Sequence, residues 1–354
     1  MAVAVASERP IPGVPEQVAT RMAFFIVGFA VAAWAPLIPY AKERLGVDEG
    51  TLGLLLLCLG IGSIVSMPLT GTLAARFGCR RVIWGATFVM CVALPCLALA
   101  STVPRLALAI LAFGAGVGTV DVTVNIQAVM VEKAAGRAMM SGFHGLFSVG
   151  GIAGAGGVSG LLWAGASPFL AMICVVVLIL IALFAFGRSL LPYGSERDAP
   201  LFVLPRGFVL FIGFLSLICF LAEGAILDWG AVFLTSVRNV APSYAGWGYT
   251  IFSIAMTVCR LTGDRVVQAL GSFRIILFGG LCAAAGLAVA VLAPSWLVAL
   301  IGFGMVGFGA SNIVPVLFSA AGRQTAMPPN LAIAAMTFLG YGNDPCVLGP
   351  QNIM

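Results

Sequence analysis

Four small or polar residues recur at helical spacing within one apolar stretch of the chain, residues 105–131. Gly114, Gly118, Asp121 and Asn125 follow one another at intervals of four, three and four, so they share one helix face. An ionisable side chain inside an apolar span is costly and indicates a function. Burial favours the protonated form of a carboxyl group, so Asp121 could exchange a proton near neutral pH. The stripe predicts a polar cavity where Asp121 carries a proton or contacts a solute; a structural hydrogen bond is the alternative.

Further polar candidates lie in other apolar stretches. His144 stands about one turn inside the stretch 140–164, and an imidazole suits proton exchange, although a packed hydrogen-bond donor would look the same. Glu223 lies roughly 22 Å along the stretch 208–233, at about 1.5 Å per residue. Trp34 and Asn312 stand beside prolines, where kinks would line a central path. We therefore expect Asn125, His144, Glu223, Trp34 and Asn312 to contact a solute.

Other chemistry has few candidate residues in the sequence. The chain has nine cysteines but no C-x-x-C pair, and it has only one histidine, so a metal site lacks ligands. No nucleophile motif or phosphate-binding loop is present. We expect neither an enzyme nor a bound cofactor.

Composition points to a membrane protein. Of the 354 residues, 61% are hydrophobic and 9% are charged, which is more apolar surface than a soluble fold of this size could bury. Apolar runs of roughly 20 residues, each able to cross a bilayer, recur along the chain. The predicted spans are 21–41, 51–75, 82–102, 105–131, 140–164, 167–187, 208–233, 244–263, 274–293 and 296–321, with a further one starting near 330.

The distribution of basic residues predicts the orientation of the chain. The net charge of +5 could suggest nucleic acid, but most of the 18 Lys and Arg fall in short loops on the amino-terminal side of these spans. The positive-inside rule then places the amino terminus in the cytoplasm. Residues 1–20, with Pro10, Pro12 and Pro15, read as a disordered cytoplasmic tail.

The sequence repeats itself. Gly53, Gly78, Arg81, Gly114 and Gly116 each have an identical residue 193 positions later. A repeat of this length predicts two homologous helical bundles with a solute site between them near the membrane midplane. We predict an all-α polytopic membrane protein with a first bundle at 21–187, a cytoplasmic linker at 188–207 and a second bundle at 208–354. Because Asn343, Asp344 and Pro345 interrupt the eleventh span, we expect the second bundle to lack most of the last one and a half of twelve spans.

The loop after the second span carries a recognisable signature. It reads Gly71-Thr-Leu-Ala-Ala-Arg76-Phe-Gly78-Cys-Arg80-Arg81, which resembles the cytoplasmic signature G-x-L-a-D-R-x-G-R-R of the major facilitator superfamily. The resemblance implies a role in gating for Gly71, Arg76, Gly78, Arg80 and Arg81. Ala75 stands where the family has Asp, so this half lacks the acidic partner. The second half keeps a relative of the signature with Arg260, Asp264 and Arg265, and we expect Asp264 and Arg265 to take part in gating as well. Arg260 and Asp264 are four apart and could pair on one helix face.

A narrower resemblance concerns the fourth and fifth spans. The run from Gly116 to Asn125, followed by Phe143-His144, is similar to the L-fucose:proton symporter branch, where G-x-G-x-x-E-x-x-x-N precedes F-N. Uncharacterised bacterial relatives of that branch share the start Trp34-Ala-Pro36-Leu-Ile-Pro39. The resemblance implies a major facilitator fold and places the proton-linked carboxylate at Asp121. His144 replaces the family's Asn, which affects the choice of sugar.

The leading hypothesis is a monomeric secondary transporter in the lipid bilayer. It would couple protons to a small polar solute, sugar-like or otherwise, by alternating access. Two alternatives stay open: efflux of amphipathic compounds, and a truncated membrane protein that no longer transports.

Overall fold

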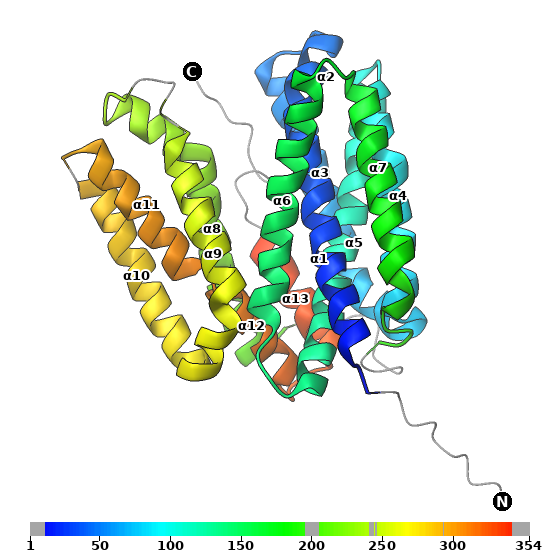
Figure 1. Cartoon of the computed structure of the whole chain (residues 1–354), viewed down its shortest axis with the longest axis vertical. Coiled ribbons are helices and arrows are strands. Elements are labelled where there is room, and N and C mark those ends of the chain that lie inside the picture. Colours follow the sequence, from blue (N-terminus) through cyan, green and yellow to red (C-terminus); the bar gives the residue numbers. More distant parts are fainter. Residues whose placement is uncertain (1–10, 195–204, 241–243, 245, 293, 342–354) are drawn as a thin grey trace, which may run out of the picture.

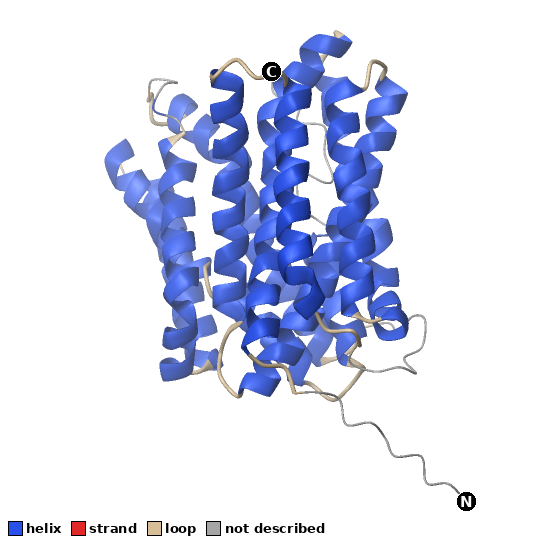
Figure 2. Ribbon diagram, turned by 45° about the vertical axis from the view of Figure 1, so that its right-hand side comes forward, coloured by secondary structure: helices blue, strands red, loops and turns tan. Residues whose placement is uncertain are grey.

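The computed structural model describes residues 11–194, 205–240, 244, 246–292 and 294–341, and the described part contains helices but no strand. Figures 1 and 2 show long, roughly parallel helices joined by short connections. The elements are α1 (Val14–Trp34), the 3-10 turn η1 (Ala35–Leu37), α2 (Ile38–Leu45), α3 (Glu49–Phe77), α4 (Cys79–Leu99), α5 (Val103–Ala135), α6 (Met140–Trp163), α7 (Pro168–Phe186), η2 (Gly187–Ser189), α8 (Phe208–Ser236), α9 (Trp247–Leu270), α10 (Ser272–Leu292), α11 (Trp296–Ala310), α12 (Ile313–Arg323) and α13 (Pro329–Tyr341).

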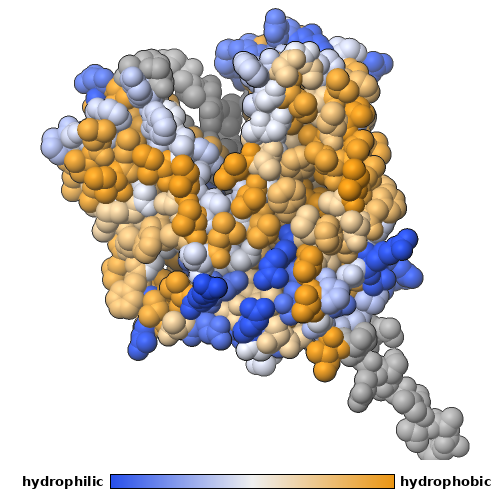
Figure 3. All heavy atoms as spheres, in the orientation of Figure 1, coloured by the Kyte–Doolittle hydropathy of each residue, from blue (hydrophilic) through white to orange (hydrophobic). Residues whose placement is uncertain are grey.

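The helices match the dimensions of a bilayer. Nine stretches of the described chain are long and apolar enough to span one, counting α11 and α12 as a single stretch. Helix α9 has 24 residues but carries Arg260, Asp264 and Arg265, and α13 is shorter. Figure 3 shows apolar side chains over most of the height of the visible face and hydrophilic ones mainly towards its two ends. The chain is therefore a multi-pass membrane protein, as the sequence predicts.

The helices form two groups, α1–α7 and α8–α13. In the first group, α3 packs on α5, α1 packs on α6, and α4 packs on both α5 and α7. In the second group, α9 and α10 pack on α11, and α8 packs on α13. The groups touch mainly through α6 with α9, α13 with α3, and α12 with α5 and α6. Residues of α12 and α13 accordingly belong to the same buried apolar cluster as α1, α5 and α6. We call this contact region between the two groups the joint. It lies at the end of the molecule where α1 begins (Figure 1).

The internal repeat of the sequence appears in the structure as equivalent glycine contacts between helices of the two groups. A Cβ atom at Gly114 would overlap the backbone oxygen of Leu59, and one at Gly307 would overlap that of Phe252, which is 193 positions after Leu59. Gly116 likewise faces the carbonyl of Ala86, and Gly309 faces that of Gly279. Each glycine lets two helix backbones approach closely, which is the usual role of small residues between membrane helices. The same packing solution is therefore used in both groups.

The turn after α3 repeats as well. Gly78 has φ 81° and ψ 153°, and Gly271, which follows α9, has φ 80° and ψ 158°. Positive φ favours glycine because it has no Cβ atom. The two turns reverse the chain in the same way on the same side of the molecule.

The structure corrects the predicted amino-terminal tail. Helix α1 begins at Val14, so residues 14–20 of the predicted tail 1–20 are helical. Pro15 lies in the first turn, where its missing N–H costs nothing, and the Glu16 carboxylate accepts a hydrogen bond from the Gly13 N–H at 2.7 Å. The predicted span 296–321 is two helices, with a break at Ser311 and Asn312. Asn343, Asp344 and Pro345 lie outside the described residues, as does half of the predicted linker, residues 195–204.

We expect Gly114→Ala to lower the thermal unfolding midpoint of the purified protein, because the new methyl group meets the α3 backbone. Overpacking of this kind costs about 1–3 kcal/mol. Gly160→Ala in α6 is the matched control, since a Cβ atom there meets nothing within 4 Å. Equal midpoints for the two variants would contradict the close contact between α3 and α5.

Candidate solute and proton site

A cavity of about 160 Å³ lies between the two groups of helices, just above their joint. Its polar lining is Asp121 of α5, His144 of α6, Glu223 of α8 and Arg260 of α9. The remaining lining is Phe147, Phe220, Gly224, Leu227, Val314 and Phe318. Both groups therefore contribute charged or ionisable side chains to one small, largely aromatic space.

The first group supplies a chain of polar contacts. Asn125 donates from Nδ2 to the Asp121 backbone oxygen at 2.9 Å, and the same nitrogen lies 3.4 Å from Asp121 Oδ1. His144 Nε2 lies 3.1 Å from Asn125 Oδ1, and because that amide oxygen can only accept, Nε2 carries the hydrogen. The His144 ring also stacks on Phe318 of α12, at 5.4 Å between centroids. Asn125 is fully buried behind Asp121 and fixes the tautomer of His144.

The second group supplies a buried guanidinium. Arg260 is 6% exposed. Its Nε donates to the Ser311 backbone oxygen at 3.1 Å, and its Nη1 donates to Ser148 Oγ of α6 at 3.1 Å. Its Nη2 lies 3.8 Å from Glu223 Oε2, which makes an ion pair longer than a hydrogen bond. One cation from α9 thus contacts α6, α8 and the break between α11 and α12.

The break between α11 and α12 explains one of these contacts. Pro315 has no N–H, so the Ser311 carbonyl four residues earlier cannot receive the usual helical hydrogen bond. Arg260 Nε donates to that carbonyl instead. Asn312, predicted to contact solute, donates from Nδ2 to the Cys259 oxygen at 3.3 Å and to Ser311 Oγ at 3.0 Å. It therefore lies beside the break and does not line the cavity.

The predicted pairing of Arg260 with Asp264 is wrong. Arg260 pairs with Glu223, and Asp264 Oδ1 accepts from the Gly142 N–H at 3.0 Å, at the amino-terminal end of α6. Adjacent turns of α9 point these charges to different partners, because unpaired N–H groups at a helix start attract a carboxylate. Sequence reasoning missed Arg260 as a cavity residue, although it stands inside the predicted span 244–263. An ionisable residue within a span is the signal that could have found it.

Several contacts close the joint below the cavity. Glu132 Oε2 accepts from the backbone N–H groups of Met139 and Met140 at 2.9 and 3.0 Å, and Arg323 of α12 lies 3.9 Å from its other oxygen. A Cβ atom at Gly71 would lie 3.0 Å from the Asn330 oxygen, so α3 and α13 are also in close contact there. Together with the contact between Asp264 and Gly142, they join the two groups at the end of the molecule where α1 begins, which we call the α1-start side.

The signature loop makes contacts within its own half. Arg80 donates from Nε to the Leu190 oxygen and from its backbone N–H to the Leu191 oxygen, both at 2.8 Å. Gly78 packs against Pro192, with no room for a Cβ atom. Arg76, Arg81 and Arg265 are exposed. Arg76, Gly78, Arg80 and Arg81 therefore lie around the segment that follows α7.

The remaining candidate, Trp34, lies elsewhere. It ends α1 and is 3% exposed, and its Nε1 has no hydrogen-bond partner among the described residues. It is not part of the cavity lining. Of the predicted solute contacts, the structure brings Asn125, His144 and Glu223 together with Asp121, whereas Trp34 and Asn312 stand apart.

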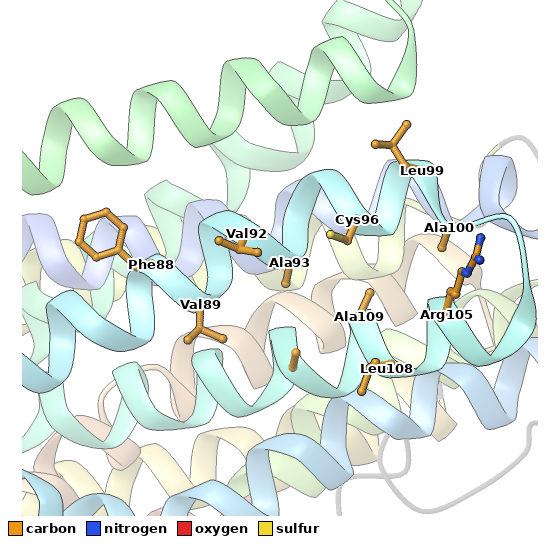
Figure 4. Close-up of a pocket in the computed structure, with 11 residues that line it drawn as sticks. Phe88, Val89, Val92, Ala93, Cys96, Leu99, Ala100, Arg105, Leu108 and Ala109 are labelled. Atoms are coloured by element: carbon orange, nitrogen blue, oxygen red, sulfur yellow. The ribbon is translucent and has the colours of Figure 1, made fainter.

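A larger cavity of about 670 Å³ lies between α4 and α5 and has a different character. Figure 4 shows it lined by apolar side chains such as Phe88, Val92 and Leu108, with Arg105 at one end. In Figure 1, α4 stands on the side of the first group that faces away from α8–α11. This groove faces the bilayer and offers a solute almost no polar contact.

Comparisons with known proteins agree with this architecture. Residues 22–343 match the family model described as Major Facilitator Superfamily. An uncharacterized MFS-type transporter of Yersinia pestis is 57% identical over 343 residues, covering 97% of this chain and 89% of that protein.

Solved structures share the fold at low sequence identity. The fucose:proton symporter FucP, in its outward conformation, matches with a TM-score of 0.77 and 15% identity over 94% of this chain and 90% of that one. The human organic anion transporter MFSD10 matches with a TM-score of 0.75 and 16% identity over 95% and 92%. With two groups of helices, repeated glycine contacts and a charged cavity between the groups, the chain belongs to the major facilitator superfamily.

Proposed function

We propose that this chain is a proton-coupled transporter of a small polar solute, working by alternating access in a bacterial inner membrane with its amino terminus in the cytoplasm. The observation that carries the proposal is the cavity shared by Asp121 and His144 of one half with Glu223 and Arg260 of the other. A solute bound there contacts both halves and so responds to their relative movement. The cavity is complete within one chain, which fits a monomer.

The closed joint corresponds to one of the two end states. Contacts between the halves gather on the α1-start side, through Asp264 with Gly142 and Glu132 with Arg323. In Figure 3 the two halves are parted at the opposite end. With the amino terminus in the cytoplasm, this is the outward-facing state, and inward opening requires these contacts to break.

Asp121 is the proposed proton carrier. It lines the cavity, is 7% exposed, and lies against the amide of Asn125, which connects it to His144. An ionisable side chain inside a span is costly and indicates a function, which supports this role. Proton binding and solute binding thereby act on the same few side chains.

The side chains that line the cavity indicate which classes of solute it could bind. Polar groups suit the hydroxyl groups of a sugar-like molecule, and one structural neighbour is a fucose:proton symporter. The aromatic lining, from Phe147, Phe220 and Phe318, favours a second candidate function, efflux of an amphipathic compound. A solute panel that includes both classes separates the two.

In proteoliposomes with a pH indicator, addition of one sugar or polyol is expected to cause proton movement with the solute. Asp121→Asn should abolish this movement, because the amide cannot carry a proton, while counterflow of the solute is retained. Asp48→Asn is the matched control, since Asp48 caps α3 outside the cavity, accepting from the Thr51 N–H at 2.7 Å. Proton movement that persists in Asp121→Asn would rule out Asp121 as the carrier.

A second experiment tests the closed joint. Asp264→Asn removes the charge at the start of α6, which should weaken the joint by about 0.3–1 kcal/mol or more and populate inward-facing protein. Spin labels at Lys133 and Gln268, both exposed near the α1-start end of α5 and α9, should then report a longer distance. The control is Glu49→Gln, which neutralises a carboxylate paired with Lys42 at the opposite end. An unchanged distance distribution in Asp264→Asn would show that the contact with Gly142 does not hold the joint.

A further inference from the structure

Three arginines gather at the turn between α3 and α4 without an acidic partner in the described part of the chain. Arg76, Arg80 and Arg81 take part in none of the ion pairs among those residues. Ala75, which is buried, occupies the position where the family signature has Asp. Arg80 bonds to the Leu190 oxygen, whereas Arg76 and Arg81 are exposed. Among the described residues, the cluster therefore presents positive charge without an ion-pair partner, at the end of the molecule where α1 begins.

These arginines line a defined space. A cavity of about 320 Å³ is bounded by the three arginines, by Gly78 and by the segment Pro192–Gly194. Gly78 brings the backbone of this segment against the turn, where the Cys79 N–H donates to the Tyr193 oxygen at 3.3 Å. The floor of the cavity is thus built by backbone contacts, and its polar lining is cationic, which suits a phosphate group.

An apolar groove continues from this cavity. It has a volume of about 380 Å³ and shares Phe77 and Arg81 with the cationic cavity. Leu73 of α3, Val82 and Val89 of α4, and Ala115 of α5 line its length. The groove exists because small residues stand where the three helices meet: a Cβ atom at Gly85 would meet nothing within 4 Å. In Figure 1, α4 stands on the side of the first group away from α8–α11, so the groove along α4 opens towards lipid.

We propose that the arginine cavity and the groove together bind one anionic phospholipid, with its phosphate among Arg76, Arg80 and Arg81 and an acyl chain along Gly85. The charge of the cavity complements the headgroup, and the apolar groove complements the chain. Anionic lipids concentrate on the cytoplasmic leaflet, where basic clusters attract them by about 1 kcal/mol per residue. This site is separate from the solute cavity, and its occupation does not depend on the proposed transport activity.

The test is lipid binding to the full-length purified protein in detergent, measured by native mass spectrometry. Phosphatidylglycerol and phosphatidylcholine with identical acyl chains are compared. We expect phosphatidylglycerol to bind more tightly, and Arg81→Gln to weaken its binding about fivefold, the equivalent of about 1 kcal/mol. Arg274→Gln is the matched control, because Arg274 is the exposed counterpart of Arg81 in the second half. It should leave binding unchanged.

A second variant tests the groove. Gly85→Leu should weaken binding of phosphatidylglycerol, because the new side chain projects into the path of the acyl chain and its Cβ atom meets nothing within 4 Å. Gly280→Leu on α10 is the control, since a Cβ atom there also meets nothing within 4 Å. Equal binding of the two lipids, or an unchanged affinity in both Arg81→Gln and Gly85→Leu, would overturn the proposal. Displacement of the lipid by equimolar glycerol phosphate would also overturn it, because the site would then be one for free phosphate.

Discussion

The buried guanidinium of Arg260 is the constraint around which the central part of the structure is arranged. A charge removed from water destabilises the fold strongly unless its donors are matched. Here the partners come from both halves: the Ser148 hydroxyl, the Ser311 carbonyl and the Glu223 carboxylate. Pro315 makes the carbonyl available by removing its helical donor. Ser148 is the one of these partners that belongs to the first half, so a movement that parts α6 from α9 breaks this contact, whereas Glu223 and Ser311 can stay with Arg260.

The two halves share their packing but differ in their charges. Glycines at equivalent positions bring equivalent backbones together, at Gly114 and Gly307, and the turns after α3 and α9 have nearly the same dihedral angles. Asp264 of α9 stands 193 positions after Gly71 and accepts a hydrogen bond from the start of α6, which a glycine cannot do. In the first half, Ala75 stands where the family signature has Asp, and the signature arginines form no ion pair among the described residues. Helix packing is therefore symmetric, whereas the joint and the arginine cluster at the turn between α3 and α4 are not.

Much of this architecture follows from the sequence, because periodicity fixes which residues share a helix face. The spacing of Asp121 and Asn125 placed both on one face, and the structure joins them by a hydrogen bond. The choice between neighbouring faces is harder to predict. Arg260 and Asp264 are four residues apart, yet they do not pair with each other, because the start of α6 competes for the carboxylate. Trp34 and Asn312 stand beside kinks as expected, but a kink does not reveal which side chain turns towards the cavity.

The charges in the cavity connect proton binding with movement of the halves. Counted by formal charge, with histidine neutral, the ionisable side chains that line the cavity (Asp121, Glu223 and Arg260) sum to one negative charge. Enclosing that charge in a space of about 160 Å³ is unfavourable, because few water molecules remain to solvate it. One proton on a carboxylate makes the cavity neutral and removes this cost. On the proposed mechanism, the protonated cavity is therefore the one that can close around an uncharged solute, and the Arg260–Glu223 pair stays balanced while Asp121 changes its charge.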